Sequence, residues 1–237
     1  MTQIQQVIEV MRSEGGFATF GRLNSLLGFA TWKTKTPEAT VRRIVQDSQA
    51  FFKVRPGLWA LTERKDELLS MFQLDGDDKK KQDAFNHSYY QGLILEIGNL
   101  RHMRTFVPSQ DKNKLFLGKP MREIATLPQI YEFTYPKIVK KAKTVDVIWF
   151  NERDMPCAFF EVEHSTDIKN SLLKFYELQD FSAKFYIVAG EYRRKLFDDV
   201  TNYSIFKPIK RRIEFKSYDF LSQLHSQAYG QVKSETL

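Results

Sequence analysis

Three acidic residues lie inside apolar segments in the second half of the chain, where carboxylates are unusual. Asp146 is the second residue of the segment VDVIWF, and Glu161 and Glu163 lie within AFFEVEHS. Side chains alternate along a strand, so Glu161 and Glu163 are expected on one face. A buried carboxylate is costly unless it is paired or holds a cation, and oxygen ligands favour Mg²⁺ or Mn²⁺. The spacing predicts an acidic metal pocket; the alternative is that these acids cap loops or pair with Lys143 or Arg153.

The elements that would carry these acids alternate between strands and helices. Hydrophobic and β-branched runs predict strands over 145–150, 158–163 and 184–189, and near 212–215. Capping residues and helical spacing predict helices over 89–100 and 191–200, and a further helix that begins after a cap at 165–167. Residues 127–141 are also predicted to be helical, with an interruption at Pro136. Together these elements predict an α/β domain with a mixed central sheet.

The first part of the chain shows a different pattern. Apolar residues recur at helical spacing over 4–11 and again over 20–27, and Thr36-Pro37-Glu38 is a typical helix start. Two short apolar runs, 51–54 and 58–61, flank the turn signal Arg55-Pro56-Gly57. This order predicts three helices followed by a β-hairpin.

The two patterned parts are separated by a polar run. Residues 75–81 (DGDDKKK) contain no apolar side chain and cannot bury surface, which indicates a linker or an exposed turn. We therefore expect a first domain over 1–74, a linker over 75–84 and a second domain over 85–237.

Composition narrows the class of protein. The chain has 36 basic and 29 acidic residues, a formal charge of +7, and its first 64 residues hold 9 basic against 5 acidic. This surplus favours a polyanionic partner without requiring one. The single cysteine, Cys157, excludes an intrachain disulfide and a cysteine-based zinc site. No apolar run approaches the roughly 20 residues that cross a bilayer, and no signal peptide pattern is visible, so we expect a cytoplasmic protein with no membrane partner.

The acidic pattern resembles the PD-(D/E)xK, or restriction-endonuclease-like, nuclease superfamily. Glu161 follows Asp146 by 15 positions and a helix follows Glu163, as in that superfamily. The resemblance implies that Asp146 and Glu161 hold Mg²⁺ or Mn²⁺, with Glu96 of an earlier helix assisting. Glu163 stands where the superfamily has lysine, so it is implied as a second metal ligand or general base. Lys169 of the following helix is the candidate replacement for the missing positive charge.

Residues 1–64 resemble the winged-helix modules that precede some restriction-type proteins, on the helix and hairpin order and the phrase FFKVRPGLWALT. In such modules the third helix enters the major groove and the wing meets phosphate. The resemblance implies two sets of DNA-binding residues, one for base edges and one for the backbone: Arg42, Arg43, Gln46 and Gln49; and Lys33, Lys35, Lys53 and Arg55. The alternative is a winged helix that contacts protein.

Together the two resemblances imply a site-specific, restriction-type DNA endonuclease that binds double-stranded DNA through the winged helix and needs Mg²⁺ or Mn²⁺. A homodimer is expected because cutting both strands requires two active sites, and a methyltransferase is a candidate partner. The alternatives are a non-catalytic DNA-binding or regulatory protein with a nuclease domain that degenerated at Glu163, a protein-interaction module, and an RNA nuclease.

Overall fold

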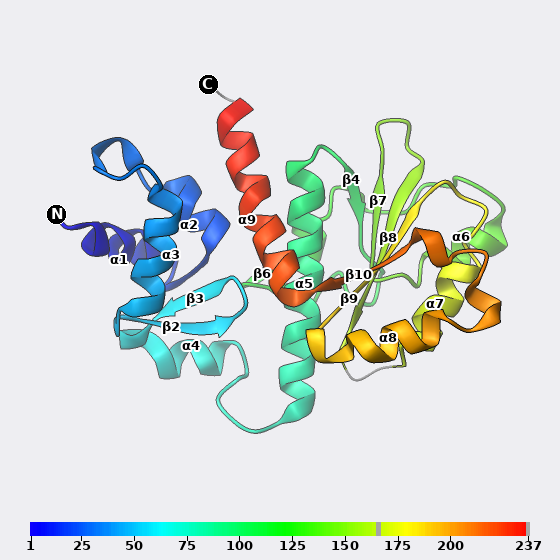
Figure 1. Cartoon of the computed structure of the whole chain (residues 1–237), viewed down its shortest axis with the longest axis horizontal. Helices are drawn as coiled ribbons and strands as arrows, with labels where there is room; N and C mark the ends of the chain where they lie inside the picture. The colour runs from blue at the N-terminus through cyan, green and yellow to red at the C-terminus, as the bar shows by residue number, and fades with distance from the viewer. Residues whose placement is uncertain (165–166, 236–237) are drawn as a thin grey trace. The chain divides into compact units, whose positions relative to one another are not determined.

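The computed structural model of the chain describes residues 1–164 and 167–235 (Figure 1). It divides into two compact units, one formed by Met1–Lys81 with Ser222–Leu237 and the other by Gln82–Leu221. Each unit has a hydrophobic core of its own. Among the described residues, no helix is long and apolar enough to cross a membrane.

The first unit combines short helices with a small sheet. Its elements in chain order are α1 (Gln3–Ser13), β1 (Phe17–Thr19), α2 (Phe20–Leu26), α3 (Pro37–Asp47), β2 (Phe51–Arg55), β3 (Leu58–Leu61) and α4 (Lys65–Met71). The strand order is β1-β3-β2 and both pairings are antiparallel. The three helices and the hairpin agree with the sequence pattern. Strand β1 was not predicted, because three residues are too few to show a period.

Local sequence explains where the elements of this unit begin and turn. Thr2 forms a capping box at the start of α1, and Pro37 occupies the first turn of α3, where its missing N–H is tolerated. Gly57 adopts a φ of +81° between β2 and β3, a conformation open to glycine. Val41 and Val45 of α3 are fully buried in the core. The other side of α3 is therefore left at the surface.

The second unit is built on five strands: β4 (Arg104–Phe106), β7 (Val147–Phe150), β8 (Pro156–Glu163), β9 (Lys184–Ala189) and β10 (Ile213–Ser217). They form one sheet in the order β10-β9-β8-β7-β4. Strand β9 is parallel to β8 and β10, whereas β7 is antiparallel to β4 and β8. The expected α/β fold with a mixed sheet is thereby confirmed. A separate small hairpin pairs β5 (Leu115–Phe116) with β6 (Lys119–Pro120).

Helices cover both faces of this sheet. They are α5 (Lys79–Leu100), α6 (Pro136–Ala142), α7 (Ile168–Tyr176) and α8 (Arg194–Thr201). The last helix of the chain is α9 (Tyr218–Glu235). Trp149 of β7 donates a hydrogen bond from its indole N–H to the Ile94 carbonyl of α5 at 3.1 Å. On the opposite face, Phe159 and Phe185 belong to the core that contains Phe175 of α7. Alternation along β8 therefore places Glu161 and Glu163 on the α7 face.

Two predicted segments differ from the structure. Helix α5 begins at Lys79, inside the predicted linker 75–84, because the Asp78 carboxylate accepts hydrogen bonds from the backbone N–H groups of Lys80 and Lys81 and caps the helix. The helix expected over 127–141 forms only over Pro136–Ala142. A proline fits the first turn of a helix better than its interior, so Pro136 starts this helix.

Helix α9 also groups differently from the predicted boundaries. The second domain was expected to run to residue 237, but the contacts place Ser222–Leu237 with the first unit. The Ser222 hydroxyl donates a hydrogen bond to the Pro56 carbonyl at 2.6 Å. A Cβ placed on Gly21 of α2 would lie 2.6 Å from the Tyr229 ring, so α9 packs directly on α2. Neither helix α9 nor the unit on which it packs was predicted from the sequence.

Candidate active site

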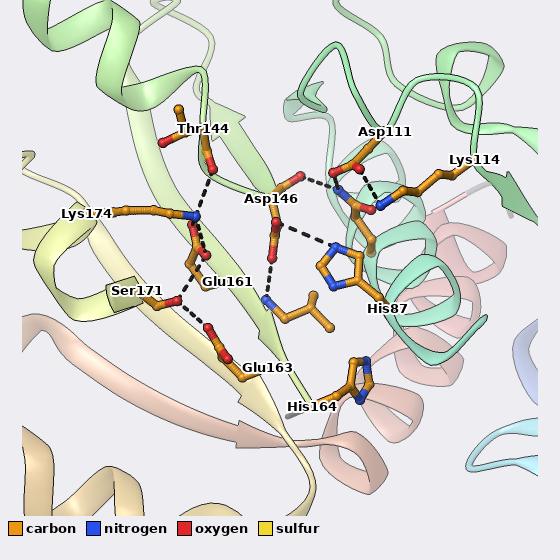
Figure 2. Close-up of polar contacts among 12 residues, drawn as sticks. His87, Asp111, Lys114, Thr144, Asp146, Glu161, Glu163, His164, Ser171 and Lys174 are labelled. Atoms are coloured by element: carbon orange, nitrogen blue, oxygen red, sulfur yellow. Dashed lines mark hydrogen bonds and ion pairs between the residues drawn. The ribbon is translucent and has the colours of Figure 1, made fainter. Parts of the chain in front are cut away.

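The three acids singled out in the sequence gather at one end of β7 and β8 (Figure 2). Asp146 directly precedes β7, and Glu161 and Glu163 are at the end of β8. Their exposed fractions are 9%, 3% and 3%, respectively. Carboxylates buried to this degree must be compensated by hydrogen bonds or opposite charge. The contacts of each acid show how this is achieved.

Backbone and side-chain contacts hold Asp146 in place. Its Oδ2 accepts a hydrogen bond from the Val162 backbone N–H at 2.8 Å, between the two glutamates of β8. Its backbone carbonyl accepts a hydrogen bond from the Gln91 side-chain amide of α5 at 2.8 Å. His87, one helical turn earlier on α5, has its Nε2 at 3.6 Å from Asp146 Oδ1. Asp146 is thereby fixed against both β8 and α5.

Helix α7 supplies the partners of the two glutamates. Lys174 Nζ donates to both carboxylate oxygens of Glu161, at 2.8 and 2.9 Å, and to the Thr144 carbonyl at 2.9 Å. The Ser171 hydroxyl lies within hydrogen-bond distance of Glu161 Oε2 at 3.1 Å and of Glu163 Oε1. A lysine and a serine from one helix therefore bind the acids that one strand presents.

Burial governs the ionisation of this cluster. It raises the pKa of Asp146, against the attraction of His87. Burial also raises the pKa of Glu161 well above its usual value, reinforced by the negative charge of Asp146 and opposed by Lys174. For Lys174, burial favours the neutral amine, but attraction and hydrogen bonding by Glu161 outweigh it and raise the pKa of the ammonium group. The lysine therefore remains positively charged beside the acids.

A second group of polar side chains adjoins Asp146 on its α5 side. His87, Asp111 and Asp146 each place a potential ligand atom within 4.8 Å of the others. Asp111 is 2% exposed; its carboxylate accepts from the Gln91 amide at 2.9 Å and pairs with Lys114 at 2.6 Å. Figure 2 shows Asp146 between this group and the Glu161–Lys174 pair.

The donor set fits a divalent cation. Carboxylate oxygens are the preferred ligands of hard cations such as Mg²⁺ and Mn²⁺, and the imidazole of His87 adds a nitrogen ligand of the kind that transition metals bind. Gln91 Oε1 is buried and, within the described part of the chain, has no hydrogen-bond partner. A buried acceptor without a donor is costly, and a cation or an ordered water would satisfy it. The chemistry of these side chains is thus compatible with a metal held around Asp146.

The chain is similar in sequence to known restriction enzymes. Residues 69–234 match the family described as the Type II restriction enzyme NmeDI C-terminal domain. The chain belongs to this family. A curated relative, the Type II restriction enzyme NmeDI of Neisseria meningitidis serogroup C, is 26% identical over 165 residues, which cover 65% of this chain. The match covers only 45% of that relative's length. No solved structure matches the chain.

The residues that match the NmeDI family include all the acids described above. Two residues that the sequence had associated with these acids, Lys169 and Glu96, lie elsewhere. Lys169 is exposed near the start of α7, whereas Lys174 contacts Glu161. Glu96 follows His87 by nine residues on α5, which places it about 180° around the helix and about 13 Å along it. The α5 residues beside Asp146 are therefore His87 and Gln91.

The residues expected to bind DNA precede the NmeDI-family match and belong to the first unit. Arg42, Arg43 and Gln46 are exposed on α3, and Gln49 is exposed just after its end. The residues expected to meet the backbone also reach the surface: Lys33, Lys35 and Lys53 are exposed, and Arg55 is partly buried and donates to the Val54 carbonyl. The structure therefore leaves both sets at the surface of one unit.

Sequence reasoning missed five members of the site: His87, Gln91, Asp111, Ser171 and Lys174. His87 and Asp111 lie far from the acidic strands in sequence and carry no local motif. Ser171 offered a weak signal, since it is a polar residue beside the apolar positions Ile168, Leu172 and Phe175 of α7.

Proposed function

We propose that the protein is a site-specific, restriction-type DNA endonuclease of the PD-(D/E)xK kind. The observation that carries this proposal is the position of Lys174: its ammonium group lies 2.8 Å from Glu161, beside two further buried carboxylates. A group of strand-borne acids with a lysine among them can both hold a cation through its carboxylates and stabilise the negative charge of a phosphodiester during hydrolysis. Membership of the NmeDI family supports the same reaction class.

The residues divide the chemistry between them. Asp146, with Glu161 on one side and His87 and Asp111 on the other, would hold Mg²⁺ or Mn²⁺. Such a cation, when bound, polarises a phosphoryl oxygen and lowers the pKa of a water molecule. Lys174 presents a fixed positive charge to the negative charge that develops on the phosphate. Glu163 accepts a proton of the attacking water as the water oxygen bonds to phosphorus. The bond between phosphorus and the sugar oxygen breaks, and the departing oxygen takes a proton from solvent.

Double-stranded DNA is bound by the first unit, acting as a winged helix. The support is the order of α1, α2, α3 and the β2–β3 hairpin, with the outer side of α3 exposed. Arg42, Arg43, Gln46 and Gln49 approach base edges, since arginine and glutamine pair with guanine and adenine in the major groove. Lys33, Lys35, Lys53 and Arg55 meet phosphates, and their contacts supply the salt-dependent part of the affinity.

Two further expectations accompany this function. A homodimer supplies one active site for each DNA strand, and light scattering of the protein with and without DNA tests it. We also propose a cytoplasmic location and a separate methyltransferase that protects host DNA from cleavage.

The second candidate function is a DNA-binding protein that no longer cuts. The observation that favours it is that Glu163 occupies the usual lysine position while Lys174 already neutralises Glu161. If Lys174 takes the place of the cation beside Glu161, the protein would bind DNA equally well with and without divalent metal.

Cleavage of plasmid and phage DNA, methylated and unmethylated, distinguishes the two functions. We expect discrete fragments with Mg²⁺ or Mn²⁺, none in EDTA, and none from Glu161→Ala. Lys174→Met should lower the cleavage rate about 10²- to 10³-fold, the usual effect of removing a charge-stabilising group. Lys169→Met is the matched control, since it removes an exposed lysine from the same helix, and it should cut normally. No cleavage by wild type, with unchanged DNA binding by Glu161→Ala, would favour the non-catalytic protein.

A further inference from the structure

Residues 223–231 of α9 border a polar groove with α3, and both segments belong to the first unit. The groove has a volume of about 660 Å³. It is lined by three glutamines and a serine of α9 and by an acid and an arginine of α3: Gln223, Gln227, Gln231, Ser226, Glu38 and Arg42. Within the described residues, no large apolar side chain lines it. The groove therefore suits a polar occupant.

The three glutamines form a stripe along α9. They recur every four residues, which returns them to the same side of a helix, and all three are exposed. The opposite side of α9 is packed: His225 is 1% exposed, and Tyr229 lies against Gly21 of α2. Packing on α2 therefore holds α9 with its amides at the surface.

A second hollow continues this groove along α3. It has a volume of about 320 Å³ and shares Glu38, Arg42 and Ser226 with the first. It adds Arg43 and Gln46, two of the side chains proposed above to approach base edges. The groove thus leads from the glutamine stripe to the proposed DNA-reading side of α3.

The groove chemistry matches a nucleic-acid backbone. The amide N–H groups and the serine hydroxyl that α9 presents are donors for phosphate oxygens. The major groove of B-DNA is about 12 Å wide and accepts one helix, so α3 and α9 cannot both enter it. If α3 approaches the base pairs, the adjacent α9 meets the sugar–phosphate strand that borders them.

We propose that α9 is a second DNA-contacting helix, whose Gln223, Gln227 and Gln231 bind phosphates beside the base pairs approached by α3. This inference rests on the proposed DNA binding by the first unit. Because glutamine is uncharged, its contacts strengthen binding to every sequence without releasing counterions. The Glu38 carboxylate in the same groove repels phosphate and limits the affinity.

A gain of charge on α9 tests the proposal even if loss variants misfold. Gln227→Lys adds one phosphate contact and should steepen the dependence of log K on log salt by about 0.9. That slope corresponds to about eightfold tighter binding at 0.1 M salt, relative to 1 M where the contact contributes nothing. Fluorescence anisotropy of labelled duplexes in EDTA measures both quantities. Gln129→Lys, an exposed glutamine of the second unit, is the matched control.

Loss of the amides gives the complementary result. Gln223→Ala with Gln227→Ala should weaken binding about 2- to 10-fold per residue, equally for different duplexes and with the salt slope unchanged. The inference is overturned if Gln227→Lys behaves like Gln129→Lys while Arg43→Ala still weakens binding; DNA binding by the first unit then stands. If wild type shows no salt-dependent binding to any duplex, both the inference and the proposed function are overturned.

Discussion

Replacing Lys174 by methionine removes the positive charge that neutralises a buried carboxylate. The Glu161 side chain is 4% exposed and Lys174 Nζ lies 2.8 Å away. At an effective dielectric constant of about 20, this attraction is about 6 kcal/mol, and the desolvation of both groups offsets part of it. Removing one partner of a buried pair typically costs about 3–5 kcal/mol. Burial and Asp146 raise the pKa of Glu161, so the remaining carboxyl takes up a proton. We therefore expect a loss near 3 kcal/mol.

The assay follows the second unit alone. Amide hydrogen exchange of peptides from β8 and α7 is measured at increasing urea concentrations, at pH 7 in EDTA. Its dependence on urea gives the free energy of unfolding of this region. Lys169→Met should change it by less than about 0.5 kcal/mol, as an exposed substitution does. Adding Glu161→Gln to Lys174→Met should recover at least about 1 kcal/mol, because the two residues interact directly. A loss below about 1 kcal/mol, or strict additivity with Glu161→Gln, would refute the charge-pair reasoning.

Two substitutions and one labelling experiment test the contacts and the burial of side chains in the second unit. A Cβ on Gly92 would lie 2.1 Å from the Phe116 ring, so Gly92→Ala should lower stability by about 1–3 kcal/mol, seen as a lower Tm; an unchanged Tm would contradict the close approach of α5. Ser171→Ala removes the hydroxyl that lies within hydrogen-bond distance of both β8 glutamates and should cost about 1.5–3 kcal/mol in urea unfolding, whereas a neutral result would show that this hydroxyl is dispensable. Burial raises the pKa of the Cys157 thiol above its ordinary 9.0, so little thiolate exists at pH 8; alkylation by iodoacetamide should be slow there and accelerate at higher pH, and rapid labelling at pH 8 would exclude the raised pKa.

Several features were predictable because they depend on neighbours in the chain. The mixed sheet follows from apolar strand-like runs, and Glu161 and Glu163 share a face because strand side chains alternate. Asp146 could be associated with them because it belongs to the preceding apolar strand segment. None of this required knowledge of the rest of the fold.

The lysine of the site could not be chosen in this way. On α7, Lys169 lies on one flank of the apolar stripe formed by Ile168, Leu172 and Phe175, and Lys174 lies on the other with Ser171, at 100° per residue. Helical periodicity identifies both flanks but does not say which one faces β8. That choice depends on how α7 packs on the sheet.

The sequence by itself determined that carboxylates would be buried on neighbouring strands, because strand period and hydrophobicity are local properties. Only the tertiary structure decided how their charge is compensated. Lys174 comes from α7, His87 and Gln91 come from α5, and the Gln91 amide connects Asp111 to Asp146. Only the fold showed that α9 packs on α2. Such contacts join segments that are distant in sequence. The packing of the apolar helix faces on the sheet decides which polar side chains reach the acids, and local sequence patterns are compatible with many choices.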